Sequence, residues 1–277
     1  LSLGLFLIVI QGVLAAIRFR SLLKVKVTQE ISLLQILRIN WIGYFFSSFL
    51  PGAVTGDLVK LIYIRDIAPG TSKSFLFTTA LIDRVFGLVG LLAVTGVSSL
   101  LYYQQVLELS PKMKGIIFFN LLLFAGSVIF VLILFLPKKS KQLISQFIGK
   151  IPKIGIKIQK LIEQFWSVGN SPKTVLTTLA LSILIQFSTI FVFWVLTAPF
   201  YSHDLSLPYI LTLVPIGLIT IAIPISPAGL GVGHAVFANL FELVHISNGA
   251  SLFNLYFLCA VFINLLGIFA YLSSGKK

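Results

Sequence analysis

The stretch LPGAVTGD at residues 50–57 interrupts one apolar segment of the chain, and PISPAGLGVGH at residues 224–234 interrupts another. Proline lacks a backbone donor and glycine is unfavourable inside helices, so we expect helices to break at both places. Irregular backbone at membrane depth persists only where it is buried in protein or lines a wet cavity. Paired interruptions in the two halves of a chain indicate a transporter-like binding site.

The composition is that of a membrane protein. Hydrophobic residues make up 57% of the 277 residues and charged residues only 10%, whereas soluble domains carry about 25% charge. Several segments reach the ~20 apolar residues that span a bilayer. We therefore predict an all-α fold, a polytopic transmembrane helical bundle that forms a single integral membrane domain over residues 1–277. The longest hydrophilic stretch, residues 137–173, is too short for an ordinary enzyme fold.

The positions of Lys and Arg predict the topology, because these residues accumulate in cytoplasmic loops. They place the loop 137–173 and the C-terminus in the cytoplasm, and the Arg18-Phe19-Arg20 end of the first span on the same side. The protein is then a multi-pass protein of the cell inner (plasma) membrane. The predicted spans are 1–17 (interpreted as a clipped N-terminal helix), 74–103, 115–136, 174–198 and 250–272.

The arms around each break are too short to be spans of their own. Residues 31–50 and 54–64 flank the first break and have basic residues at both outer ends, which predicts a re-entrant hairpin. Residues 208–223 and 235–246 form a second hairpin that enters from the opposite side. Two such hairpins are expected of an inverted repeat, although no residue-level repeat is visible.

The cytoplasmic loop 137–173 carries apolar residues at helical spacing, among them Leu143, Phe147 and Ile151, with lysines over much of the remaining surface. This pattern predicts two short amphipathic helices that lie on an anionic leaflet. The alternative is a solvated connector that packs on its own helices. The net charge of +13 follows this topology, so we expect no nucleic-acid partner.

Asp83 and Arg84 are the strongest ionisable signal within a span. Counting from Lys73 at about 1.5 Å per residue places Arg84 roughly 16 Å deep. Charges at that depth cost about 2.5–3.5 kcal/mol each and face a cavity or a partner. In the functional interpretation Arg84 holds an anionic headgroup, which Asp83 orients. In the structural alternative the two residues brace the first hairpin through Asp57 or Lys60.

Further candidate residues lie on the hairpins. Asp57 could be an ordinary helix cap, and Lys60 and Arg38 could snorkel to the interface instead of meeting a phosphate. His234 opens a helix whose first amides could bind an anion. No tight ligand spacing is present, so we expect neither a metal nor a cofactor. The remaining candidates for substrate binding are Asn40, Gly52, Gly56, Pro227, Gly229 and Gly231.

Four motifs occur in a fixed order along the chain: Asn40-x-x-Gly43-x-x-Phe46, then Leu50-Pro51-Gly52-x-x-x-Gly56-Asp57, then Asp83-Arg84-x-x-Gly87, then Pro224-x-x-Pro227-x-Gly229-x-Gly231. In these motifs the chain resembles the membrane domain of lysylphosphatidylglycerol synthases and its stand-alone, flippase-like relatives. The chain departs from that pattern at Lys60, where arginine is usual, at Asp83, where glutamate is usual, and at His234, near a position usually occupied by glutamate.

The resemblance implies a polytopic helical domain that moves or handles an amphiphilic lipid. The function we expect is that of a flippase-like translocator of an anionic phospholipid or an isoprenoid or glyco-lipid, without enzymatic activity of its own. Its partners are then membrane lipids, and the resemblance leaves room for a partner synthase or transferase. The alternatives are a membrane enzyme subunit that binds a lipid-linked substrate, with Asp57 as its only plausible catalytic carboxylate, and a small-solute secondary transporter.

Overall fold

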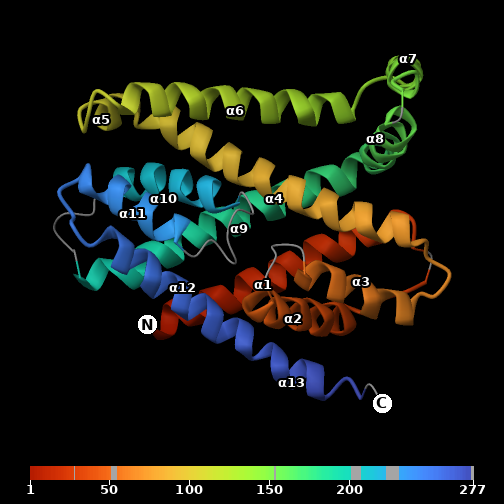
Figure 1. Ribbon diagram of the computed structural model, residues 1–277, viewed down its shortest axis with the longest axis horizontal. Coiled ribbons are helices and arrows are strands. Elements are labelled where there is room, and N and C mark those ends of the chain that lie inside the picture. The colour runs from red at the N-terminus through yellow and green to blue at the C-terminus, as the bar shows by residue number, and fades with distance from the viewer. Residues whose placement is uncertain (28, 51–54, 153, 201–206, 223–230, 276–277) are drawn as a thin grey trace.

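The computed structural model is a helical bundle and describes the chain except residues 28, 51–54, 153, 201–206, 223–230 and 276–277. Helices long and apolar enough to cross a bilayer occur at each of the five places that the sequence predicts, and several of them run lengthwise in Figure 1. The prediction of a multi-pass helical membrane protein is confirmed. These helices are α1 (Ser2–Leu23), α4 (Lys73–Leu101), α6 (Met113–Leu134), α9 (Pro172–Thr197) and α12 (Gly249–Leu265), which α13 (Gly267–Leu272) follows.

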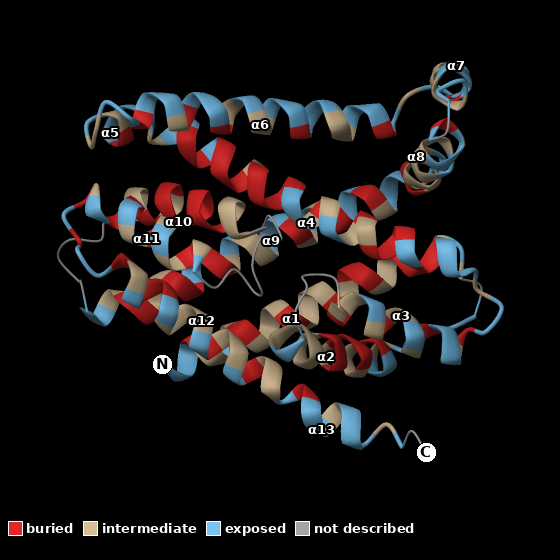
Figure 2. Cartoon of the chain, in the orientation of Figure 1, coloured by how far each residue is buried: buried red, intermediate tan, exposed pale blue. Residues whose placement is uncertain are grey.

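Among these spans α4 is the central one. In its apolar stretch 56% of the residues are buried, against 17% in α6, whose outer side is largely exposed in Figure 2. The close approach of α4 to α9 depends on Gly90, where an added Cβ would collide with the backbone and side chain of Ser182. Small residues allow such approaches between membrane helices. The charged pair Asp83 and Arg84 therefore lies on the most buried of these spans.

The first helix is longer than predicted. The expected span ended at Ile17, but α1 continues to Leu23 and includes Arg18 and Arg20. Arg18 is only 7% exposed, so it does not belong to a loop at the membrane surface as the charge pattern suggested. Arg18 is buried because it pairs with a residue of α4, and the local sequence does not reveal this partner.

Around the first break, α2 (Leu33–Phe49) and α3 (Thr55–Ile67) lie side by side. A capping box begins α2, because the Ser32 Oγ accepts from the Gln35 amide while the Gln35 Oε1 accepts from the Ser32 amide. Gly43 and Gly56 meet at the crossing, where a Cβ on Gly56 would collide with the Gly43 carbonyl. Both arms are helical as predicted. Their re-entry into the membrane stays a prediction.

Around the second break, α10 (Leu207–Ala222) contacts α11 (Val232–Glu242). Their core is aromatic: Phe237 stacks on Phe193 of α9 at 5.4 Å between ring centroids and on Phe253 of α12 at 5.0 Å. These stacked rings fix α11 against two spans. That both hairpins belong to an inverted repeat also stays a prediction.

The loop 137–173 folds into two helices, α7 (Lys138–Gly149) and α8 (Gly155–Gly169), as its pattern predicts. They join through polar groups: the Ser145 Oγ donates to Glu163 at 2.8 Å. Large apolar side chains point outward instead, with Phe147 70% and Ile156 64% exposed. In Figure 1 α7 is seen end-on while α6 runs lengthwise, so α7 lies across the span. The short elements α5 (Tyr103–Leu107) and η1 (Ala198–Phe200) complete the described fold.

Candidate functional site: a charged cluster beside a lateral groove

Asp83 and Arg84 each find an ionic partner on another helix, as their depth requires. The Arg18 guanidinium of α1 donates two hydrogen bonds to Asp83, from Nε to Oδ1 at 2.8 Å and from Nη2 to Oδ2 at 3.0 Å. Its Nη1 donates to the Ser182 Oγ on α9 at 3.1 Å. This bidentate pair ties three spans together. Arg18 was not among the site residues predicted from the sequence, because Arg20 and Lys24 near it made the segment look like the end of a span at the membrane surface.

Asp57 is the second carboxylate of the cluster and lies between two cations. Its Oδ1 is 2.6 Å from the Lys60 Nζ one turn further along α3, and its Oδ2 accepts from the Arg84 Nε of α4. Asp57 lies in the first turn of α3, where a carboxylate is favoured, so the predicted location at a helix start is correct. The bracing of the first hairpin through Asp57 is also present in this geometry.

Lys60 is buried and does not reach out to an interface. It is 7% exposed, and its Nζ lies 3.5 Å from the Asn40 Oδ1 and 5.2 Å from the centre of the Phe19 ring. Asn40 in turn donates to the Gly12 carbonyl at 3.2 Å, which connects the cluster to α1. A desolvated ammonium is tolerable here because a carboxylate, an amide oxygen and an aromatic face surround it.

The cluster has an excess of positive charge. Arg18, Lys60 and Arg84 face the two carboxylates of Asp57 and Asp83, which gives a net charge of +1 over these five residues. The Arg84 side chain is 39% exposed, whereas those of Arg18 and Lys60 are 9% and 8% exposed. Arg84 is therefore the cation that a bound group can reach, and an anion there would neutralise the cluster.

An apolar groove of about 450 Å³ lies between α3 and α4, and none of the five charged residues of the cluster lines it. On α4 its residues Lys73 and Phe77 share a helix face with Arg84, because they are spaced by about one, two and three turns. Arg84 therefore stands at the deep end of the stripe, about 16 Å along the helix axis from Lys73. The groove is lined by Leu58, Leu61, Ile62, Arg65, Lys73, Leu76 and Phe77.

A smaller cavity of about 160 Å³ lies between α1, α2, α9 and α12, and Gly12, whose carbonyl accepts from Asn40, lines it. Polar side chains line part of its wall, among them Gln11, Tyr44 and Asn264. Tyr44 also faces the cluster, since the Lys60 Nζ is 6.0 Å from its ring centre. This cavity could take water or a small polar group, but not a whole lipid.

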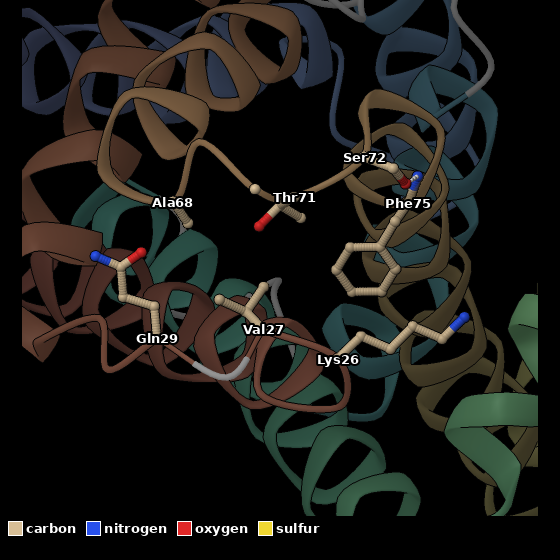
Figure 3. Close-up of a pocket in the computed structure, with 8 residues that line it drawn as sticks. Lys26, Val27, Gln29, Ala68, Thr71, Ser72 and Phe75 are labelled. Carbon is tan, nitrogen blue, oxygen red and sulfur yellow. Dashed lines mark hydrogen bonds between the residues drawn. The ribbon is translucent and has the colours of Figure 1, made fainter.

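A third cavity, of about 330 Å³, lies where the α1–α2 and α3–α4 connections meet (Figure 3). The labelled side chains of Gln29, Thr71 and Lys26 surround it, and the Lys26 Nζ lies 5.6 Å from the centre of the Phe75 ring. None of the site residues predicted from the sequence lines this cavity.

The other predicted residues lie apart from the charged cluster or help to build it. Arg38 donates to the Ala270 carbonyl and to Ser273 at the end of the chain, so it fastens α2 to α13. The His234 Nδ1 accepts from the Gly231 amide at 3.4 Å, and its ring meets Phe253 edge-on. Gly56 serves the α2–α3 crossing described above. Gly52, Pro227 and Gly229 lie outside the described residues. Among the residues that are described, no group of three or more His, Cys, Asp or Glu could hold a metal ion.

One comparison with known proteins identifies relatives of this chain. The family model described as "Lysylphosphatidylglycerol synthase TM region" matches residues 1–267. No curated protein matches the chain. No solved structure matches it either.

Proposed function

Since this chain belongs to the lysylphosphatidylglycerol synthase transmembrane family, we propose that it moves an anionic lipid between the leaflets of the membrane. The observation that carries the proposal is the exposed guanidinium of Arg84, which belongs to a cluster of net positive charge and follows Phe77, a residue of the apolar groove, by about two turns of α4. A lipid with a phosphate headgroup and apolar tails has the matching chemistry. Both an anionic phospholipid and an isoprenoid or glyco-lipid phosphate belong to this class.

The groove would take the tail while the cluster takes the phosphate. Leu58, Ile62 and Phe77 are each about half exposed along the groove and offer an apolar track. Arg65 and Lys73 at the groove's outer part would attract the headgroup first. Arg84 would receive it next, because a guanidinium binds a phosphate with two parallel bonds.

Asp57 would act as the displaceable partner of Arg84. It bonds to Arg84 and Lys60 through different oxygens, so it keeps a cationic partner when a phosphate takes over Arg84. The exchange then leaves no unpaired charge inside the protein, which keeps its free-energy cost low. Arg18 and Asp83 hold α1, α4 and α9 in register during this exchange.

The remaining parts of the proposal concern orientation and partners. The two broken hairpins would be re-entrant and would enclose the polar path. The helices α7 and α8 would lie on the anionic cytoplasmic leaflet with Phe147 and Ile156 in the lipid. A synthase or transferase would supply or consume the lipid, and no chemical step is assigned to this chain.

The test is lipid movement in reconstituted vesicles. Vesicles with the purified protein and a phosphatidylglycerol labelled on its acyl chain are treated with an impermeant quencher, which reports the label that reaches the outer leaflet. Replacing Arg84 by Ala removes a charged hydrogen-bond partner worth about 1.5–3 kcal/mol, so we expect movement to slow at least about ten-fold. Arg84→Lys keeps the positive charge but loses the two parallel hydrogen bonds of the guanidinium, and should retain part of the rate.

Two controls make the result specific. Lys157→Ala removes a cation from α8, away from the groove, and should leave the rate unchanged. A labelled phosphatidylcholine should move more slowly than the anionic lipid. Wild-type movement by Arg84→Ala would contradict the proposal. Protein that binds the anionic lipid through Arg84 without moving it would favour the alternative of a lipid-binding enzyme subunit.

A further inference from the structure

A second lateral groove lies on the far side of α4, between α6, α10 and α11. Its volume is about 480 Å³. Most of its lining is apolar, including Phe119, Ile219 and Val236. It shares no lining residue with the groove beside Arg84. The proposed translocation path does not use it.

A buried amide in this groove has no partner. Asn120 of α6 is 4% exposed, and its Nδ2 makes no hydrogen bond within the part of the chain that the structure describes. The other two polar side chains of the groove are bonded locally, Thr220 to the Gly217 carbonyl and the Asn239 amide to the Ala235 carbonyl. An unsatisfied buried donor is unfavourable, because it has lost its hydrogen bonds to water without a replacement. Asn120 lines the groove, so a rotation of its side chain would bring this donor to whatever fills it.

A cation stands on the same face of α6 at its start. Lys112 precedes Ile116, Phe119 and Asn120 by one to two helical turns, at the spacings that put residues on one helix face. The axial distance from Lys112 to Asn120 is about 12 Å. From the end of the span inward, the order is a positive charge, an amide donor and an apolar channel.

We propose that this groove is a binding site for one anionic diacyl glycerophospholipid. Its phosphate meets Lys112, an ester carbonyl accepts from the Asn120 Nδ2, and one acyl chain lies between α6, α10 and α11. A prenyl phosphate has the charge and the tail but no ester carbonyl for Asn120. The site does not depend on the proposed translocation, because it lies on other helices and uses none of the charged cluster.

The chain offers a matched pair of variants for the test. A Cβ added at Gly115, in the groove wall, meets nothing within 4 Å, and the same holds at Gly126 on the same helix. Gly126 lies three turns further along the same face and does not line the groove. Gly115→Phe therefore starts from open space in the groove wall and should narrow the groove, and Gly126→Phe is its control.

The experiment is photo-crosslinking of the whole purified protein with a phosphatidylglycerol that carries a diazirine in one acyl chain. Labelled peptides should include residues 216–220 and 236–240. We expect Gly115→Phe to reduce this labelling at least five-fold and Gly126→Phe to leave it unchanged. Asn120→Leu should weaken binding about five-fold, since it removes one neutral hydrogen bond, while the lipid-free protein unfolds at the same or a higher temperature. A merely structural Asn120 would instead lower that temperature.

Unlabelled lipids distinguish the occupants. Phosphatidylglycerol should compete best, and phosphatidylcholine and farnesyl phosphate should compete poorly. Equal competition by all three, or wild-type labelling of Gly115→Phe, would overturn the proposal. Arg84→Ala should leave labelling of this groove intact, so failure of the translocation proposal and failure of this one give different results.

Discussion

The Arg18–Asp83 pair offers a direct test of the cluster, through the replacement Arg18→Met. The two side chains are 9% and 13% exposed and share two hydrogen bonds. Removing one partner of such a pair costs about 3–5 kcal/mol, because the other charge stays buried and uncompensated. Ser182 adds little to this cost, since its hydroxyl also donates to the Thr178 carbonyl. The loss of unfolding free energy in Arg18→Met therefore comes mainly from the Asp83 carboxylate, which is left buried without its partner.

The expected signature is strong coupling between the two sites. In a chain of this size about 1 kcal/mol shifts the unfolding temperature by roughly 2–4 °C. Arg18→Met and Asp83→Leu should then each lower it by roughly 6–20 °C. The double variant should come within about 4 °C of the wild type, because an apolar pair of similar volume replaces a buried ion pair at little cost.

The assay is thermal unfolding of detergent-purified protein, followed by intrinsic tryptophan fluorescence, and analysed as a double-mutant cycle. Arg20→Met is the matched control. Arg20 lies on the same helix and donates to the Ile31 carbonyl at 2.9 Å, so its loss should cost only about 1 kcal/mol. A double variant whose loss equals the sum of the two single losses would refute the reasoning.

Three further predictions follow from other parts of the structure. Gly231→Val should lower the unfolding temperature through its backbone, because Gly231 has φ 82° and ψ −59° and open space at its Cβ; a residue with a side chain is strained in this conformation at a cost of about 1–3 kcal/mol, and an unchanged unfolding temperature would contradict the prediction. Cysteines placed at Lys24, Lys73 and Ser140 should react with an impermeant thiol reagent from the same side of the membrane, and labelling of Lys24 and Lys73 from opposite sides would exclude a re-entrant first hairpin. A fluorophore on Phe147→Cys should be quenched by lipid-borne quenchers, whereas one on Lys160→Cys should be quenched far less; equal, weak quenching of both would show that α7 is a solvated connector.

The sequence by itself determined the class of the protein and the location of its helices. Apolar length predicts the spans from α4 to α12, because the bilayer sets a minimum helix length that any spanning segment must meet. Helical spacing likewise predicts α7 and α8. The cost of burying a charge also indicated that Asp83 and Arg84 needed partners. Each of these properties depends on one contiguous segment of about 20 residues.

Only the tertiary structure decided which partners those charges have. Arg18 lies 65 positions from Asp83 and 164 from Ser182, and no periodic pattern carries information over such separations. The same holds for Asn120, which is one polar residue in an apolar helix in the sequence and lines a groove with α10 and α11 in the structure. A sequence pattern specifies which face of a helix is buried, but the choice of neighbour depends on how all the helices pack. The charged cluster and the groove of this protein both depend on how helices that are distant in the sequence pack together.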